Sequence, residues 1–225
     1  MQILLQLSLW VIPAIVAITL HEAAHGYVAW RLGDDTAKRL GRVSFNPLRH
    51  VDAFGTLIVP ALLILSGSRF LFGWAKPVPV DFWRLNNPRR DMMWVAAAGP
   101  GINLGLAIVS AALMHLASYV PGFAGAWLIA NLENSVLINL VLAVFNMIPL
   151  PPLDGGRVAV GLLPRSLALP FARLERFGLF IIIGVLFILP LIGDQIGVNL
   201  SLFPWLVGVP VEFLFRIVMA VAGHG

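Results

Sequence analysis

Long apolar runs, separated by short basic segments, dominate the hydrophobic pattern of this chain. Five runs approach or exceed the length of about 20 residues that a membrane helix needs, and they lie near 3–30, 92–119, 133–148, 177–192 and 202–222. The third run is short, and we expect an apolar continuation beyond Gly156 to extend it. A sixth run, Phe54–Leu65, is too short for a comfortable span. The pattern predicts an all-α polytopic membrane protein with five to six transmembrane helices.

The positions of Lys and Arg indicate how the chain crosses the membrane. They gather in the segments 31–53, 73–91 and 157–176, whereas 120–132 and 193–201 contain none. Because short cytoplasmic loops are rich in Lys and Arg, the three basic segments are expected on one face. This requires the chain from 54 to 72 to dip into the membrane and return. We therefore predict a re-entrant element there, an N-terminus outside and a cytoplasmic C-terminus. An actual span that violates the charge rule is the alternative.

Two segments beside the predicted re-entrant element are expected to be extended. LGRVSFNPL, residues 40–48, alternates moderately and resembles an edge strand. KPVPV, residues 76–80, contains prolines, which disfavour helix in the residue before each of them. Non-helical backbone at membrane depth must be buried in protein or line a wet cavity. The predicted fold class thus includes a re-entrant or strand element over 40–80.

The composition agrees with a membrane protein and limits the classes of function. Only 12% of the 225 residues are charged and 59% are hydrophobic, whereas soluble domains carry about 25% charged residues. The net charge of +4 comes from Lys and Arg placed between apolar runs, so we expect no nucleic-acid partner. The absence of cysteine rules out disulfides and thiolate metal ligands. We see no repeat or linker, and we predict a single integral membrane domain over 1–225.

A cluster of ionisable residues interrupts the first apolar run. HEAAH, residues 21–25, follows an almost wholly apolar stretch, and ionisable groups at membrane depth mark functional sites by default. Helical spacing places His21 and His25 on one face, where they can bind one metal ion. Glu22 is offset to the side, within reach of a water on that metal. At about 1.5 Å per residue, the motif lies near the inner edge of the membrane.

A second unusual stretch offers a third metal ligand. Catalytic zinc usually takes three protein ligands and leaves one position open. In FNMIPLPPLDGGR, residues 145–157, the prolines must break a helix. Asp154 is the only acid between 134 and 174, and a buried carboxylate is costly unless it is paired or bound to metal. Asp154 is therefore the best candidate for the third ligand. Capping of the helix that follows is its alternative role.

Together, HEAAH and NMIPLPPLDGG (146–156) resemble the two signatures of the site-2 protease family of intramembrane zinc metalloproteases. The resemblance is to the small bacterial and archaeal type without a PDZ or CBS domain. AAAGPGINLGLA (96–107) and GWAKPVPV (73–80) are further matches, and the resemblance covers roughly residues 10–160. It implies a metalloprotease core over 1–162, and hydropathy alone predicts the additional C-terminal helices at 165–225. The strand-like element of 40–80 would then lie near the active site.

The resemblance also implies roles for individual residues. One Zn²⁺ per chain is expected on His21, His25 and Asp154, with Glu22 as the catalytic base. Asn146 matches an asparagine that contacts the substrate backbone or the oxyanion, and is therefore a catalytic and substrate-binding candidate. We also take Asn103 as a candidate substrate-binding residue, and a contact that joins two helices is its alternative role.

The implied function is hydrolysis of peptide bonds within or near the transmembrane segments of membrane protein substrates, as in regulated intramembrane proteolysis. We expect a multi-pass protein of the cell membrane, embedded in the lipid bilayer, with its active site near the cytoplasmic face. The alternative is a non-proteolytic zinc-binding membrane protein, such as a metal carrier or a chaperone-like binder. Glu22 argues against it, because a pure binder needs no non-ligand carboxylate beside the histidines. The sequence names neither the substrate nor the oligomeric state.

Overall fold

The computed structural model of the chain describes residues 2–66, 73 and 75–224. Over these ranges, all regular secondary structure is helical. Five of the described helices are long and apolar enough to cross a membrane, namely Leu4–Arg31, Pro88–Ala117, Gly122–Asn146, Glu175–Ile196 and Pro204–Val221. These helices confirm the prediction of an all-α, multi-pass membrane protein.

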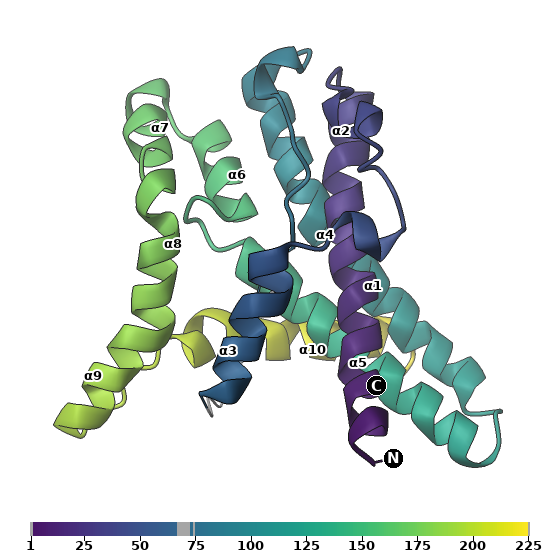
Figure 1. Cartoon of the computed structure of the whole chain (residues 1–225). Helices are drawn as coiled ribbons and strands as arrows, with labels where there is room; N and C mark the ends of the chain where they lie inside the picture. The colour runs from purple at the N-terminus through teal and green to yellow at the C-terminus, as the bar shows by residue number, and fades with distance from the viewer. Residues whose placement is uncertain (1, 67–72, 74, 225) are drawn as a thin grey trace.

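Three long helices form the centre of the molecule (Figure 1): α1 (Gln2–Arg31), α4 (Pro88–Ala117) and α5 (Gly122–Asn146). Small residues such as Ala17, Ala107 and Ala111 are fully buried in this group. Small side chains let membrane helices approach closely. The apolar core extends from α4 and α5 to the last helix, α10 (Val209–Val221), through Leu140 and Val211.

The third membrane helix differs from its sequence prediction. The helix α5 begins at Gly122 and ends at Asn146, so its extra length lies before residue 133 and not beyond Gly156. The stretch 122–133 is mostly apolar despite Asn131 and Glu133, and it continues the helix. The prolines that follow Ile148 end it. The residues after them form a separate short helix, α6 (Asp154–Leu162).

The chain between α1 and α4 leaves one end of the molecule and returns to the same end. The π-helical turn η2 (Ala53–Ile58) and the helix α3 (Val59–Leu65) extend toward the end where the N-terminus lies (Figure 1). The rest of the predicted re-entrant segment, apart from Ser66, lies outside the described residues. On return, the N–H of Asn86 donates to the carbonyl of Leu32 at 2.8 Å. The basic segments 31–53 and 73–91 therefore lie together.

No strand forms in the described part of 40–80, so the strand predicted over 40–48 is wrong. Residues 40–46 form turns and bends, and the 3₁₀ helix η1 (Pro47–Arg49) follows them. Residues 75–81 are without regular structure, and two of their backbone N–H groups donate to groups outside any sheet. Lys76 donates to the carbonyl of His50 at 2.9 Å, and Val78 donates to the carboxylate of Glu22 at 2.8 Å. A 3₁₀ turn, η3 (Phe82–Arg84), then leads toward α4.

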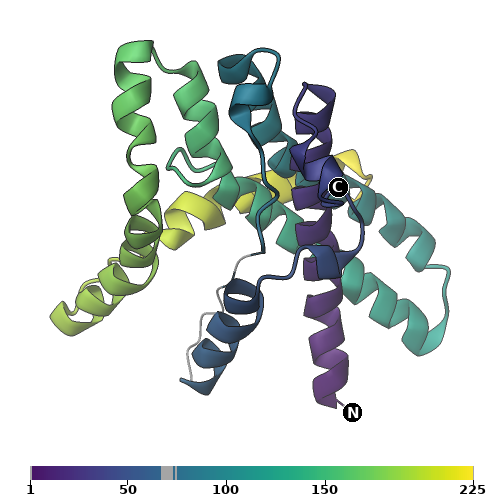
Figure 2. The same ribbon diagram turned by 45° about the horizontal axis from the view of Figure 1, so that its top comes forward.

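The remaining helices lie around this centre. The short helix α2 (Thr36–Arg39) follows α1, and α7 (Arg165–Ala172) follows α6. The next long helix consists of α8 (Glu175–Ile183), the π-helical turn η4 (Gly184–Ile188) and α9 (Leu189–Ile196). A further π-helical turn, η5 (Pro204–Gly208), leads into α10. The two views in Figures 1 and 2 show α10 crossing the direction of α1.

The chain end does not lie where the charge pattern predicts. The Nε2–H of His224 donates to the carbonyl oxygen of Ala111 at 2.8 Å, and its ring stacks on that of His115. Both contacts are in the C-terminal part of α4, whereas the basic segments surround its start at Pro88. The prediction that the C-terminus shares the face of the basic segments is therefore wrong. The direction of α10 accounts for this, because the helix crosses the direction of α1 and ends beside the C-terminal part of α4.

Candidate metal centre

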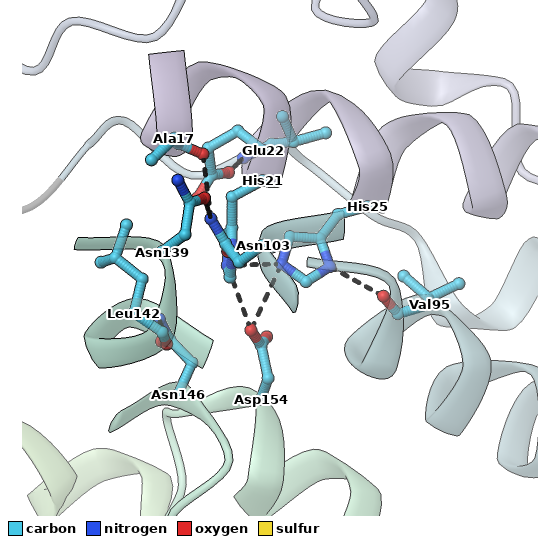
Figure 3. A network of polar contacts seen from close by, with 11 residues as sticks. Ala17, His21, Glu22, His25, Val95, Asn103, Asn139, Leu142, Asn146 and Asp154 are labelled. Atoms are coloured by element: carbon cyan, nitrogen blue, oxygen red, sulfur yellow. Dashed lines mark hydrogen bonds and ion pairs between the residues drawn. The ribbon is translucent and has the colours of Figure 1, made fainter. Parts of the chain in front are cut away.

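Two histidines stand one turn apart on α1, and both are buried (Figure 3). Their Nε2 atoms are 3.0 Å apart. Each Nδ1 is engaged elsewhere, for His21 with Asn103 Oδ1 at 2.5 Å and for His25 with the carbonyl of Val95 at 2.7 Å. Because carbonyl oxygens only accept hydrogen bonds, each Nδ1 carries the proton. In the neutral rings, both Nε2 atoms then present lone pairs toward the same point.

Asp154 faces the two histidines from the first turn of α6 (Figure 3). Its Oδ2 lies 3.3 Å from Nε2 of His21 and 3.3 Å from Nε2 of His25. This oxygen is buried and has no hydrogen-bond partner among the described residues. No side chain caps α6 by a hydrogen bond, so the alternative capping role of Asp154 is not seen.

These three side chains form a group that can hold a metal ion. Their ligand atoms all lie within 4.8 Å of one another, and the three residues are buried. The Nε2 atoms of two imidazoles and a carboxylate oxygen converge on one point, so they can act together as ligands of one cation. Imidazole nitrogen and carboxylate oxygen are zinc ligands, and three of them leave a fourth position open. The donor set therefore fits Zn²⁺.

Close backbone packing brings Asp154 to this position. The loop 147–153 folds back on the start of α6, where a Cβ on Gly155 would lie 2.6 Å from the carbonyl oxygen of Ile148. A Cβ on Gly156 would lie 2.5 Å from the carbonyl carbon of Leu150. Side chains of any size would push the loop away, so the Gly155-Gly156 pair is what permits the approach.

One face of α4 supports both histidines without offering a ligand. Val95, Gly99 and Asn103 are spaced by four and lie on one side of the helix. Val95 and Asn103 provide the two Nδ1 acceptors, and Gly99 lies directly against the imidazoles. A Cβ on Gly99 would lie 2.5 Å from His21 Cε1 and 2.5 Å from His25 Nε2. Sequence reasoning did not identify the Val95 carbonyl, because a backbone acceptor leaves no signal in residue type.

Two cavities meet beside the three-residue group. One, of about 560 Å³, is lined mainly by apolar side chains of α1, α5 and the α8–η4 segment, and by Phe203. The other, of about 310 Å³, lies between the 75–82 segment, α4 and the start of α6, where Arg157 lines it. Both cavities are bordered by His21, Glu22 and Asn146. The group is therefore reached from an apolar side and from a more polar side.

The other predicted site residues occupy different positions. Glu22 lies outside the three-residue group, and its Oε2 accepts the N–H of Val78 at 2.8 Å. Asn146 lies at the end of α5 and donates to the carbonyl of Leu142 at 3.0 Å. Asn103 is fully buried behind His21, and it lines neither cavity. The substrate-binding role of Asn103 thus stays a prediction that these contacts do not favour.

Comparisons with known proteins agree with a polytopic helical protein that carries a metal centre. Residues 122–189 match the family described as Peptidase family M50. The chain is 41% identical over 193 residues to "Putative zinc metalloprotease YwhC" of Bacillus subtilis, which covers 80% of each chain. It is also 34% identical over 141 residues to "Putative zinc metalloprotease Rip2" of Mycobacterium tuberculosis, which covers 63% of this chain and 52% of the relative. No solved structure matches the chain.

These findings define the class of the protein as a multi-pass membrane zinc metalloprotease. The chain belongs to Peptidase family M50, the site-2 protease family. The resemblance seen in HEAAH and NMIPLPPLDGG is thereby confirmed.

Proposed function

We propose that this protein is an intramembrane protease that hydrolyses peptide bonds within or near the transmembrane segments of membrane proteins. The observation that carries this proposal is the position of Glu22. This carboxylate stands apart from the convergent group of His21, His25 and Asp154, at the junction of the two cavities. A proteolytic site needs such a base beside its metal, and a site that only binds metal does not.

In this proposal, His21 Nε2, His25 Nε2 and Asp154 Oδ2 hold one Zn²⁺ per chain. When bound, zinc supplies a Lewis acid that lowers the pKa of water and polarises a carbonyl group. Glu22 takes the proton of the attacking water and later delivers it to the leaving amine. The N–H of Val78 holds one oxygen of Glu22, which orients the carboxylate. Asn146 borders both cavities, where its amide can stabilise negative charge on the scissile carbonyl oxygen.

The larger cavity suits an apolar substrate segment. Its walls include Ile18 of α1, Val141 of α5 and Leu179 of α8. A transmembrane helix hides its carbonyls in its own hydrogen bonds, so we propose that the substrate unwinds where the two cavities meet. The neighbouring 75–81 segment borders the smaller cavity and can accompany the unwound backbone. Its structure is irregular, so pairing there takes place without a preformed sheet.

We further propose that the centre lies near the cytoplasmic face of the cell membrane. The basic segments around Leu32 and Asn86 lie together, and His25 precedes the end of α1 at Arg31 by less than two turns. Cytoplasmic loops concentrate Lys and Arg. The N-terminus is then outside, and the chain around α3 dips into the membrane from the cytoplasmic side. Water reaches the centre from that face.

Substitution of Glu22→Gln tests the proposed chemistry. We expect zinc binding to be retained and cleavage to fall by about 10²–10⁴-fold, because a general acid–base group contributes that much. Zinc content is measured on the purified protein. Cleavage is measured by comparing membrane proteomes of cells that express each form, where single-span stubs should accumulate with the variant.

Glu133→Gln is the matched control, because this exposed glutamate lies on α5 and lines neither cavity. It should leave both zinc content and cleavage unchanged. Cleavage at the wild-type rate by Glu22→Gln would overturn the mechanism. Loss of zinc from that variant would instead identify Glu22 as a ligand and favour a zinc-binding function.

A further inference from the structure

A chain of buried polar groups leads from the metal centre into the middle of the helix bundle. Asn103 Oδ1 lies 2.5 Å from His21 Nδ1, and Asn103 Nδ2 donates to Asn139 Oδ1 at 2.7 Å (Figure 3). Asn139 Nδ2 donates in turn to the carbonyl oxygen of Ser135 at 2.8 Å and reaches its hydroxyl at 3.3 Å. The hydroxyls of Ser135 and Ser110 are 2.8 Å apart. This series of hydrogen bonds therefore joins α1, α4 and α5 behind His21.

These amides are placed where polar groups are expensive. Asn103 is 0% exposed and Asn139 is 1% exposed. Fully buried apolar residues lie close by, among them Val136 and Leu140 on α5. A buried amide costs free energy unless its groups are hydrogen-bonded, and small apolar residues would join these helices equally well. This hydrogen-bonded series therefore has a role that packing alone does not require.

The direction of the hydrogen bonds indicates the role of this series. His21 donates to Asn103, Asn103 donates to Asn139, and Asn139 donates to Ser135, so every donor points away from the metal centre. Hydrogen bonds in such a series polarise one another. Each outward bond thus makes the oxygen of Asn103 a stronger acceptor for the imidazole N–H. A strong acceptor at Nδ1 fixes the tautomer of a metal-binding histidine and raises the basicity of its other nitrogen.

The two histidines differ in how this support is supplied. His25 donates to the backbone carbonyl of Val95, which is present whatever side chain stands at that position. His21 depends on the side chain of Asn103, which is itself held by Asn139 and by a longer bond of 3.4 Å to the carbonyl of Ala17. Support of His21 is therefore the part of the centre that a side-chain substitution can remove.

We infer that Asn103 and Asn139 are positioning residues of the metal centre, which orient His21 and raise its affinity for the ion. This inference rests on the proposed zinc ligands. It assigns Asn103 a role behind the ligand in place of the predicted contact with substrate. Asn139 acts one step further from the metal, by holding the carboxamide of Asn103 in the orientation that offers its oxygen to His21.

The test measures metal affinity of the full-length protein in detergent or nanodiscs, by competition with a zinc chelator. Asn103→Leu should weaken zinc binding by about 10–100-fold, as loss of the outer partner of a metal ligand typically does. Asn139→Leu should weaken it by a smaller factor, because Asn103 keeps its bond to His21. The absorption spectrum of the Co²⁺-substituted protein should change in both variants, since it reports the geometry of the ligands.

Asn134→Leu is the matched control. Asn134 also lies on α5 and also ties it to α1, by donating to the carbonyl of Leu9 at 2.8 Å, but it has no bond to the chain behind His21. A purely structural role of asparagines that join helices would affect all three variants alike. Asn134→Leu should leave zinc affinity and the Co²⁺ spectrum as in the wild type. Asn103→Asp keeps an acceptor for His21 and should restore affinity relative to Asn103→Leu.

Wild-type zinc affinity and an unchanged Co²⁺ spectrum in Asn103→Leu would overturn the inference. Should that variant fail to fold, Asn139→Leu carries the test, and unchanged affinity there overturns it equally. Failure of the proposed function has a different signature. In that case the wild-type protein binds no zinc, or Glu22→Gln still cleaves substrate, whatever happens at Asn103.

Discussion

The three helices around the two histidines, α1, α4 and α5, and the helix α8 beside the larger cavity are held to the protein in different ways. Buried polar contacts join α1, α4 and α5, as in the series His21, Asn103 and Asn139. Among the described residues, the helix α8 touches the loop before α6 at Gly178, which lies against Pro151 and Pro152. It also forms an ion pair of 3.4 Å between Arg157 and Glu175, whose side chains are partly exposed. One region is thus fixed by directional contacts, and the other rests on contacts that tolerate displacement.

This difference matches what each region has to do. The proposed ligands and base must be held in one geometry, because a misplacement of about 1 Å can cost about 10²-fold in rate. The wall of the larger cavity, to which Leu179, Ile182 and Leu186 contribute, has to receive a bulky apolar segment. Regions with few buried contacts open at low free energy. Substitutions at the contacts that hold the two histidines should therefore affect metal binding and rate together, and those at α8 should affect substrate binding alone.

The largest effect is expected at Gly99, where α4 touches the imidazoles. A Cβ on Gly99 would lie 2.5 Å from His25 Nε2 and 2.6 Å from His21 Nε2. Gly99→Ala should displace both rings, abolish tight zinc binding and lower kcat/KM by at least about 10²-fold. Zinc content and cleavage of a single-span substrate in proteoliposomes measure the two effects.

Gly101→Ala is the matched control on the same helix, because a Cβ there meets nothing within 4 Å. Alanine also favours helix over glycine, so this variant should be as active and at least as stable as the wild type. Equal loss of zinc in both variants would show that α4 is sensitive along its whole length, and that contact with the histidines is not the cause.

A smaller effect is expected at Gly178, where α8 touches the loop that carries Asp154. A Cβ on Gly178 would overlap the carbonyl of Pro151, so one of the two elements must move. Since the loop is packed against α6, we expect α8 to move. Gly178→Ala should then lower kcat/KM by about tenfold, which corresponds to about 1.4 kcal/mol, through a higher KM and with zinc content unchanged.

Gly184→Ala provides the comparison within the same long helix, because a Cβ there meets nothing within 4 Å. It should leave kcat/KM unchanged. If Gly178→Ala instead loses zinc, the loop has moved and α8 is the better-fixed element. The proposed difference between the two regions would then be reversed.

The residues of the metal centre were within reach of the sequence because their chemistry lies in side-chain type and spacing. His21 and His25 share one helix face, and Asp154 is conspicuous as an acid among apolar residues. The contacts that support the two histidines could not be predicted from the sequence. Val95 acts through its backbone, and Asn103 meets Asn139 across 36 positions of sequence, a pairing that no local pattern reveals. The sequence alone therefore does not decide between the two possible roles of Asn103.

The fold likewise has parts that the sequence predicts and parts that it does not. Apolar runs predicted the long helices because a membrane span is a matter of length and hydrophobicity. The start of α5 was missed because Asn131 and Glu133 suggest a boundary, although the helix passes through them. The alternation over 40–48 indicated a strand, but a strand forms only with a partner, and partners are set by tertiary structure. Loop charge did place 31–53 beside 73–91, which the bond between Asn86 and Leu32 shows.

The smallest effect is expected for the ion pair that joins α6 to α8. Arg157 and Glu175 are 3.4 Å apart, and their side chains are 36% and 52% exposed. Exposed pairs of this kind contribute about 0.2–1 kcal/mol or less. Glu175→Gln should therefore change the free energy of unfolding by less than about 1 kcal/mol, with zinc content and kcat/KM preserved. Reversible denaturant unfolding in mixed micelles measures the first quantity.

Glu212→Gln is the control for Glu175→Gln, since Glu212 forms an exposed pair with Arg216 on α10 and neither residue lines a cavity. The two variants should be indistinguishable in stability. A large loss of stability or activity in Glu175→Gln alone would mean that α8 depends on a directional polar contact, as the metal-bearing helices do. The cavity wall would then be as rigid as the centre, and substrate would have to enter by another side. Equal, small effects in both variants instead leave apolar packing as what holds α8, which is the property that lets it yield to a substrate helix.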